Sequence, residues 1–361
     1  MSSTLPELQF TYETPNVGST VIPQYIIRNK YIITEKLGKG KFGEVYKGKD
    51  TQTNEIVAVK LEHHIMPKPN PYSKYYTKHN EFAVLKHETQ ILNYLHNRRC
   101  CNIPYIYWYG IQSGIPSLVM PYYEFSLFDL FTQTAHKHTK YRYSSQTADW
   151  KPNDIIRSII RIVENVHALG VVHRDIKPHN FMVKNRELVL IDFGMATFYV
   201  DEHNQHIPEP EKQKEHLLGT QKYISINIHY GKEYTRRDDL ISAGYLYLFL
   251  RNWLFWDRVV YIPSDMVYPN TTLINDQNTY KTHNVVSSRI HQYPDTHICH
   301  PKNVCFKMSK EFSNIEKCIL DVTDKTHDNV NSTLEYLRYS YALGFNETPN
   351  YQLLSRLFSV T

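Results

Sequence analysis

The first third of the chain alternates between apolar and polar positions in short runs, the pattern of β-strands. Tyr31 to Leu37 and the run that starts at Val45 are separated by a glycine-rich turn, and Glu55 to Leu61 forms a third, β-branched run. Two further runs lie between Ile103 and Met120, with breaks at Gly110 and Gly114, and apolar residues recur at helical spacing from Glu81 to Leu95. These patterns predict a small lobe with five strands and one main helix.

Helical spacing dominates the rest of the chain, in the segments Ser126 to Phe131, Ile155 to Leu169, Asp239 to Arg251 and 311–360. Together the two halves predict an α+β fold with a β-rich N-terminal lobe at 28–121 and a larger, mainly helical lobe at 122–361. Residues 1–27 carry prolines among polar residues and indicate an N-terminal extension. Residues 257–310 are rich in Pro, Asn, His and Tyr and predict an irregular insert.

Composition narrows the class of protein. The chain has 361 residues, 41% of them hydrophobic, and a net charge of +5, so it is globular and is not a dedicated nucleic-acid coat. Five cysteines without regular spacing favour reduced thiols, and we expect a cytoplasmic or nuclear protein. The sequence contains no run that predicts a signal peptide or a membrane span. We expect a monomer with no direct nucleic-acid contact.

Three of the 13 glycines cluster at Gly38, Gly40 and Gly43. This G-x-G-x-x-G spacing also occurs in dinucleotide-binding folds, where the glycines open a helix. Here a strand follows them, which favours a hairpin whose backbone N–H groups can approach phosphate oxygens closely. An ordinary glycine hairpin remains the alternative at this point.

Lys60 ends the apolar strand Val57-Ala-Val-Lys60. A lysine in such a place needs an anionic partner, either phosphate oxygens or a carboxylate from the next helix, where Glu88 lies. The alternative is a solvated lysine and an unrelated surface glutamate.

The sequence His173-Arg-Asp-Ile-Lys-Pro-His-Asn180 follows an apolar pair and carries the most specific signal. The Asp175 carboxylate can accept a proton from a hydroxyl, and Lys177 can neutralise a transferring phosphoryl group. Asn180 supplies an oxygen suited to Mg²⁺. Twelve residues further on, the strand at Leu188 delivers Asp192 of an Asp-Phe-Gly sequence, a second carboxylate suited to a divalent metal.

With all four elements in this order, the chain resembles the eukaryotic protein kinases over roughly residues 28–360. The resemblance implies that Gly38, Gly40 and Gly43 cover the ATP phosphates and that Lys60 binds them while it pairs with Glu88. It makes Asp175 the residue that accepts the substrate proton, Lys177 the one that steadies the γ-phosphoryl group, and Asn180 and Asp192 the ligands of magnesium. Around the adenine it places Val45, Ala58, Met120, Pro121, Tyr123 and Met182.

Within the kinases, the segment Gly219 to Glu233 is similar to the casein kinase 1 superfamily, including the vaccinia-related and some viral kinases. Ser225-Ile-Asn227 stands where other kinases have Ala-Pro-Glu, and Arg236-Arg-Asp-Asp-Leu240 opens an apolar helix. The resemblance implies that Asp239 stabilises the catalytic-loop backbone. It also implies serine/threonine specificity, with acidic or phosphate-primed protein substrates.

Lys222 and Arg236 are the candidates for binding a phosphate on such a primed substrate, although Arg236 and Arg237 suit a structural role equally well. Lys222 stands where the family often has arginine, and Pro121 where it often has an acidic residue. The alternative function is a non-catalytic nucleotide-binding scaffold that works through partner binding.

A cluster of zinc-type ligands, His297, Cys299, His300 and Cys305, lacks the spacing of a standard finger. Solvated histidines and a buried cysteine are the simpler interpretation.

Overall fold

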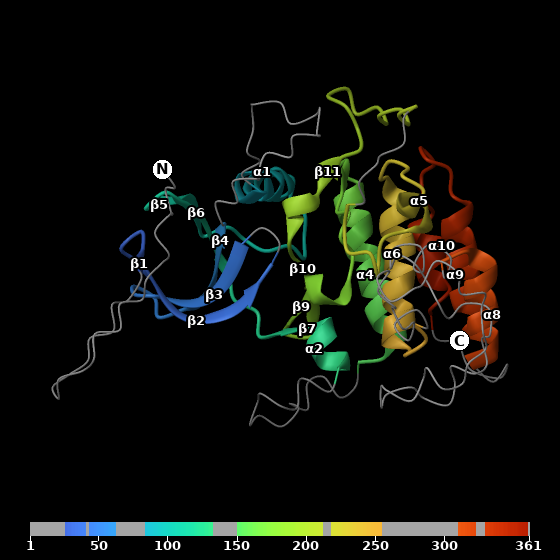
Figure 1. Ribbon diagram of the computed structural model, residues 1–361, viewed down its shortest axis with the longest axis horizontal. Coiled ribbons are helices and arrows are strands. Elements are labelled where there is room, and N and C mark those ends of the chain that lie inside the picture. Colours follow the sequence, from blue (N-terminus) through green and yellow to red (C-terminus); the bar gives the residue numbers. More distant parts are fainter. Residues whose placement is uncertain are drawn as a thin grey trace, which may run out of the picture.

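The computed structural model describes residues 26–40, 43–62, 84–132, 150–211, 218–254, 310–322 and 329–359. It has the two-lobed α+β architecture that the sequence predicts: a strand-rich N-terminal lobe and a larger helical lobe, on the left and right of Figure 1. Residues 1–25 of the predicted extension, residues 257–309 of the predicted insert at 257–310 and the candidate zinc ligands lie outside the described residues. No helix of the described part is long and apolar enough to span a membrane.

The N-terminal lobe is built on one antiparallel sheet with strand order β1-β2-β3-β4-β6-β5. Its strands are β1 (Ile26–Ile27), β2 (Tyr31–Lys39), β3 (Gly43–Asp50), β4 (Ile56–Glu62), β5 (Trp108–Gln112) and β6 (Ile115–Pro121). The sheet has six strands where the sequence pattern predicted five. The difference is β1, a two-residue edge strand that pairs with Tyr31 and Ile32 and begins inside the predicted extension.

Of the two breaks predicted in this region, the one at Gly114 is confirmed and the one at Gly110 is wrong. Gly110 lies inside β5, and the chain turns at Ser113 and Gly114, whose φ angles are 50° and 79°. Two consecutive residues with positive φ are the signature of a tight hairpin turn. A glycine within a strand can be tolerated, so its presence alone did not mark the break.

Both faces of the sheet are packed, because successive side chains of its central strand, β4, point to opposite faces. Val57 and Val59 on β4 are fully buried in a cluster with Ile27 and Val119, as expected for side chains two residues apart on one face. Helix α1 (Val84–Asn97) contributes Leu85 to a second cluster, with Leu118 and Met120 of β6. The helix is therefore fixed against the sheet.

The C-terminal lobe surrounds a large apolar core. Its helices are α2 (Leu127–Phe131), α4 (Pro152–His167), α5 (Ile226–His229), α6 (Arg236–Leu250), α8 (Phe312–Val322), α9 (Val330–Ala342) and α10 (Tyr351–Arg356). Short strands β7 (Phe125–Ser126), β9 (Phe181–Lys184) and β10 (Glu187–Leu190) form one small sheet, and β8 (Val171–Val172) pairs with β11 (Thr197–Phe198). The 3₁₀ turns Pro178–Asn180 and Phe193–Met195 complete the region between the lobes.

Helix α6 runs through the middle of this lobe and is buried on nearly every side. It begins at Arg236, where the Arg-Arg-Asp-Asp-Leu motif places its start. Helical spacing alone predicted a start three residues later, because the charged residues Arg236 to Asp239 mask the apolar pattern. The Asp238 carboxylate accepts a hydrogen bond of 2.9 Å from the N–H of Thr235 and so caps this end of the helix. Such a fully buried helix is typical of a lobe centre.

Candidate active site

Lys60 lies between two carboxylates at the junction of the lobes. Its Nζ donates to Glu88 Oε2 of α1 and to Asp192 Oδ1, both at 2.7 Å. The Glu88 side chain is 1% exposed. The predicted pairing of Lys60 with Glu88 is thus confirmed, and the structure adds Asp192 as a second partner.

The charges of Lys60 and its two carboxylate partners shift one another's pKa values. Burial lowers the pKa of Lys60, but the charges of Asp192 and Glu88 outweigh burial and raise it, so the ammonium stays protonated. Burial raises the pKa of Asp192, but the Lys60 charge and hydrogen bond outweigh it and lower this pKa to about 2. The site therefore holds a cation that can meet phosphate oxygens and an ionised carboxylate that can meet a metal.

The position of Glu88 depends on how α1 is held. At its N-terminus the Glu62 carboxylate, at the end of β4, accepts hydrogen bonds from the N–H groups of Val84 and Leu85 at 2.9 and 3.1 Å. A carboxylate satisfies the free N–H groups there and complements the helix dipole. From the same helix, His87 Nε2 lies 2.7 Å from the carbonyl oxygen of Ala196. Glu62 and His87 thus tie α1 to the sheet and to the segment after Asp192.

The glycine cluster forms a hairpin between β2 and β3, as predicted. Gly38 pairs with Val45, and the N–H of Gly40 donates to the Gly43 carbonyl at 2.8 Å. A Cβ at Gly43 would lie 2.0 Å from the Leu61 carbonyl oxygen, whereas one at Gly38 would meet nothing within 4 Å. Gly43 is therefore required by packing against β4, and Gly38 leaves the surface of the turn open.

Sheet register brings the predicted adenine-side residues together. Val45 pairs with Lys60, and Ala58 pairs with Met120. Pro121 follows Met120 directly, and Tyr123 lies two residues further on. Below them Met182 of β9 pairs with Ser126 of β7. The structure thus places these residues along the junction of the two lobes.

The catalytic-loop residues form one hydrogen-bonded network around Asp175. Lys177 Nζ donates to Asp175 Oδ2 at 2.5 Å. Asn180 Nδ2 donates to the same carboxylate at 3.1 Å and to the Asp175 carbonyl at 2.9 Å. The three predicted catalytic residues therefore lie in one hydrogen-bonded network, and the contacts of Lys177 and Asn180 fix the orientation of the Asp175 carboxylate.

Thr220 completes this network from 45 residues away. Its hydroxyl donates to Asp175 Oδ1 at 2.7 Å, and Lys177 Nζ donates to the Thr220 hydroxyl at 3.1 Å. This contact was not predicted from the sequence, in which the one relevant signal is the glycine that precedes Thr220. In the structure Gly219 has a φ of 96°, which brings the chain back towards the loop.

Asp239 supports the loop from below. Its two carboxylate oxygens accept hydrogen bonds from the N–H groups of His173 and Arg174 at 2.7 and 2.9 Å, which confirms the predicted contact. The N–H of Asp175 donates to His173 Nδ1 at 3.3 Å, so the other ring nitrogen is the one that donates to the Ile191 carbonyl. Burial lowers the pKa of His173, in keeping with this neutral ring.

Two residues of the site have a left-handed backbone. The φ angles of Arg174 and Asp192 are 67° and 68°, which non-glycine residues adopt at a cost of roughly 1–3 kcal/mol each. Asp239 holds the first through its backbone N–H, and Lys60 holds the second through its side chain. The Arg174 guanidinium donates to the Met195 carbonyl and lies over the Tyr234 ring.

Asn180 and Asp192 fit a magnesium ion. Both offer oxygen ligands, and the low pKa of Asp192 keeps its carboxylate ionised. No cluster of three or more His, Cys, Asp or Glu ligands occurs in the residues that the structure describes. Mg²⁺ commonly takes only one or two protein ligands and completes its shell with phosphate and water oxygens. The pair can therefore hold a metal together with a nucleotide.

The two candidate phosphate-binding residues are not brought together. Lys222 follows Thr220 closely and has its Nζ 5.6 Å from the Phe249 ring centre. Arg236 is 9% exposed, donates to the Asn346 carbonyl at 3.0 Å and stacks on Tyr199. Its guanidinium is committed to the C-terminal segment, so the structure supports the structural interpretation of Arg236 over the substrate one.

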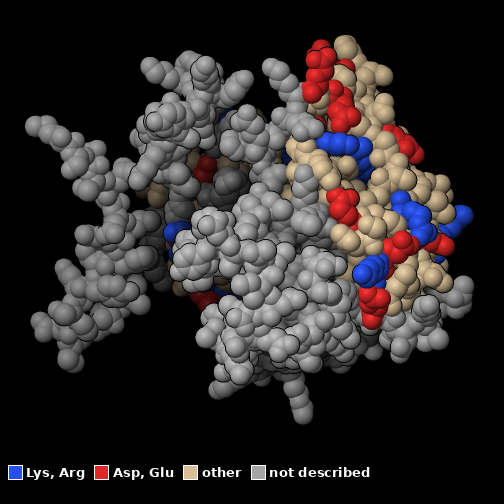
Figure 2. All heavy atoms as spheres, turned by 45° about the vertical axis from the view of Figure 1, so that its right-hand side comes forward, with Lys and Arg blue, Asp and Glu red and all other residues tan. Residues whose placement is uncertain are grey.

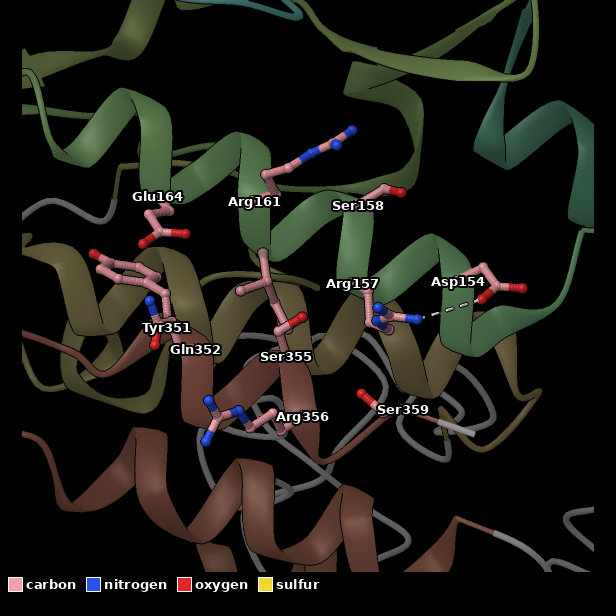
Figure 3. Close-up of a pocket in the computed structure, with 11 residues that line it drawn as sticks. Asp154, Arg157, Ser158, Arg161, Glu164, Tyr351, Gln352, Ser355, Arg356 and Ser359 are labelled. Carbon is pink, nitrogen blue, oxygen red and sulfur yellow. Dashed lines mark ion pairs between the residues drawn. The ribbon is translucent and has the colours of Figure 1, made fainter. Parts of the chain in front are cut away.

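A groove of 530 Å³ lies between α4 and α10 (Figure 3), away from the residues above. Its rims carry charged residues of both signs: Asp154, Arg157, Arg161, Glu164 and Arg356. On the face of the helical lobe that Figure 2 shows, basic and acidic side chains are likewise interspersed over the described part. A neighbouring cavity of 460 Å³ is lined by His167, Arg236 and Tyr351. Neither contains the carboxylates and lysines of the catalytic network.

A comparison with protein families agrees with this geometry. The family model described as the protein kinase domain matches residues 31–327. The match spans the glycine hairpin, Lys60, the Asp175 network and Asp192.

Proposed function

The chain belongs to the protein kinase family, and on that premise we propose that it is an active serine/threonine kinase. It would transfer the γ-phosphate of ATP, bound with Mg²⁺, to serine and threonine hydroxyls of protein substrates. The observation that carries this proposal is the complete network around Asp175, with Lys60 and Asp192 paired beside it.

The residues present divide the work of an in-line phosphoryl transfer. Lys60 and the backbone of the glycine hairpin would hold the phosphates. Asp175 would orient the substrate hydroxyl and accept its proton, while the ammonium of Lys177 would neutralise charge that develops on the transferred group. A magnesium ion held by Asn180 and Asp192 would supply further charge neutralisation on the phosphate oxygens.

Specificity for serine and threonine finds support in the same place. Lys177, bonded to both Asp175 and Thr220, stands in the His-Arg-Asp-x-Lys-Pro-x-Asn order of the serine/threonine kinases. Ser225 and Asn227 both donate to the Asp238 carboxylate, so the Ser-Ile-Asn sequence anchors the segment to the start of α6. This arrangement supports the casein kinase 1-like assignment.

The arrangement also supports activity without phosphorylation of the chain itself. Glu88 is already paired with Lys60, and the Arg174 guanidinium is already bonded to the Met195 carbonyl. No new charge is needed to assemble these contacts.

The scaffold alternative has no specific support. A protein that only bound a nucleotide would not need Asp175, Lys177 and Asn180 in one network. The discriminating experiment incubates the purified chain with Mg-ATP and an acidic protein rich in serine and threonine, beside an Asp175→Asn control. Transfer by the wild type and its loss in the control are expected; equal transfer by both, or none by the wild type across varied substrates, would overturn the proposal.

A further inference from the structure

Lys310 has a fully buried side chain beneath the segment that follows Gly219. Its Nζ donates to the carbonyl oxygens of Gln221 and Ile224, both at 2.7 Å, and lies 3.2 Å from His229 Nε2. The same Nζ lies 5.0 Å from the centre of the Tyr245 ring on α6. Lys310 therefore joins two carbonyls of one segment to the helix at the centre of the lobe.

The two hydrogen bonds do not depend on the proton state of the amine. Burial lowers the pKa of Lys310 well below its ordinary value. A lysine amino group carries at least two N–H bonds in either state, which suffices for the Gln221 and Ile224 carbonyls. Lys310 therefore holds both carbonyls in either protonation state. We refer to this pair of hydrogen bonds as the clamp.

The carbonyls that Lys310 holds belong to a tight turn. The Thr220 carbonyl accepts hydrogen bonds from the N–H groups of Tyr223 and Ile224 at 2.7 and 3.0 Å. Two carbonyls three residues apart can point at one nitrogen only when the chain between them turns in this way. Lys310 therefore adds two hydrogen bonds to those that the turn makes within itself.

This turn carries the residues that meet the substrate side of the site. Thr220 donates to Asp175 at its start, and Lys222 lies between the two clamped carbonyls. Any loosening of the turn would move both side chains relative to Asp175.

Hydrogen bonds next to the Lys310 amino group also hold this segment in place. Glu311, the next residue, accepts a hydrogen bond from the Tyr230 hydroxyl, at the other end of the same segment. The Lys310 carbonyl in turn accepts one from Tyr341 on α9 at 2.9 Å. The segment from Gln221 to Tyr230 is thus fastened at both ends to the residues that precede α8.

We propose that Lys310 is a positioning residue for the protein substrate: it fixes the Thr220–Ile224 turn and thereby the placement of Thr220, which donates to Asp175, and of Lys222 in the same turn. The inference rests on the proposed kinase activity, since it assigns a role in the same site. A positioning role for Lys310 can be told apart from a packing role by experiment. Packing predicts a loss of stability alone, whereas positioning predicts a loss of function directed at the protein substrate and not at ATP.

The test uses the full chain with Lys310→Met, which keeps the length of the side chain and removes the donors. Steady-state kinetics on an acidic serine peptide are expected to show kcat/KM for the peptide reduced about tenfold, the size expected when two buried hydrogen bonds are lost together. The KM for ATP should stay within about twofold of the wild type, since Lys310 contacts none of the nucleotide-side residues. Lys310→Gln, which retains an amide donor, should have a kcat/KM for the peptide between those of the wild type and Lys310→Met. This variant replaces Lys310→Met in the test if Lys310→Met does not fold.

The matched control is Tyr336→Phe. Tyr336 is also a buried donor to a carbonyl of this lobe, that of Leu240 at 2.9 Å, but it does not contact the clamped turn. It should lower the melting temperature and leave both KM values unchanged. If the Lys310 variants behave like this control, the positioning role is overturned.

A second readout separates this inference from the proposed function. Amide hydrogen exchange in Lys310→Met should rise in the peptides that cover 219–230 and stay at the wild-type level in α4 and α6. This holds whether or not the chain transfers phosphate. A wild type without kinase activity would contradict the proposed function alone. Amide hydrogen exchange that is unchanged at 219–230 in Lys310→Met would contradict the role of Lys310.

Discussion

The ring of His167 lies 3.0 Å from Asp239, the carboxylate that holds the catalytic-loop backbone, and both side chains are 1% exposed. The other ring nitrogen of His167 lies 2.7 Å from the Tyr351 hydroxyl on α10. A continuous hydrogen-bonded path therefore runs from the C-terminal helix through His167 and Asp239 to the N–H groups of His173 and Arg174.

This path predicts that His167→Leu will impair catalysis from a position outside the site. Removing one partner of a buried charged contact should lower the free energy of unfolding by about 3 kcal/mol, because Asp239 loses a hydrogen bond that it cannot replace with water. We also expect a lower kcat, because the catalytic-loop backbone rests on Asp239. Tyr351→Phe, which removes only the hydroxyl at the outer end, should cost about 1 kcal/mol. Denaturant unfolding and steady-state kinetics measure both; a His167→Leu protein as stable as the wild type would contradict the path.

The low pKa of Asp192 predicts a specific dependence of stability on pH. This pKa is about 2 in the folded protein, against an ordinary value of 3.8. Between these values the unfolded chain binds more protons, so the stabilisation from the Asp192–Lys60 pair is complete above about pH 4 and is lost as the pH falls towards 2.

Denaturant unfolding of the wild type and Asp192→Asn across this range checks the prediction. The variant has no carboxylate to titrate at this position, so the difference in unfolding free energy between the two proteins should be greatest above pH 4 and should shrink below it. A difference that stays constant from pH 5 to pH 2.5 would show that the pair contributes no such linkage.

The two outer glycines of the hairpin should respond differently to substitution. Gly43→Ala places a Cβ against the Leu61 carbonyl, a backbone atom that cannot move away cheaply. We expect a loss of about 1–3 kcal/mol of stability from this overpacking. Gly38→Ala, where the Cβ meets open space, should fold as well as the wild type. Thermal unfolding of the two variants measures this difference in stability, and equal melting temperatures would refute the steric argument.

Lys222 and Arg236 should differ in their effect on a primed substrate. Lys222→Glu is expected to reduce activity on a pre-phosphorylated peptide more than on an unprimed one, because it replaces a cation in the Thr220–Ile224 turn with an anion. Arg236→Gln should reduce both activities by the same factor, because its guanidinium serves the C-terminal segment. The ratio of kcat/KM values for the two peptides is the measurement. An unchanged ratio in Lys222→Glu would remove that residue from substrate recognition.

Much of the fold was predictable because its elements are local. Alternation located β2, β3, β4 and β6, and helical spacing located α1, α4 and α6 to within a few residues. The errors fell where local signals are weak: β1 is only two residues long, and the start of α6 is formed by charged residues. These elements depend on pairing and burial that distant residues supply.

The order of the chemical groups along the chain could be read from its residues, since the glycine cluster, Lys60, Asp175, Asn180 and Asp192 form a specific series. The sequence also predicted the pairing of Lys60 with Glu88 and the contact of Asp239 with the loop. Other features of the site became visible only in the folded chain. Lys60 also meets Asp192 across 132 positions, and Thr220 joins Asp175. Arg236 is buried, and Lys310 binds two carbonyls of the turn that contains Lys222. Helix and strand patterns are set by neighbours along the chain, whereas the partner of a buried charge is set by whichever distant segment the packed core brings against it.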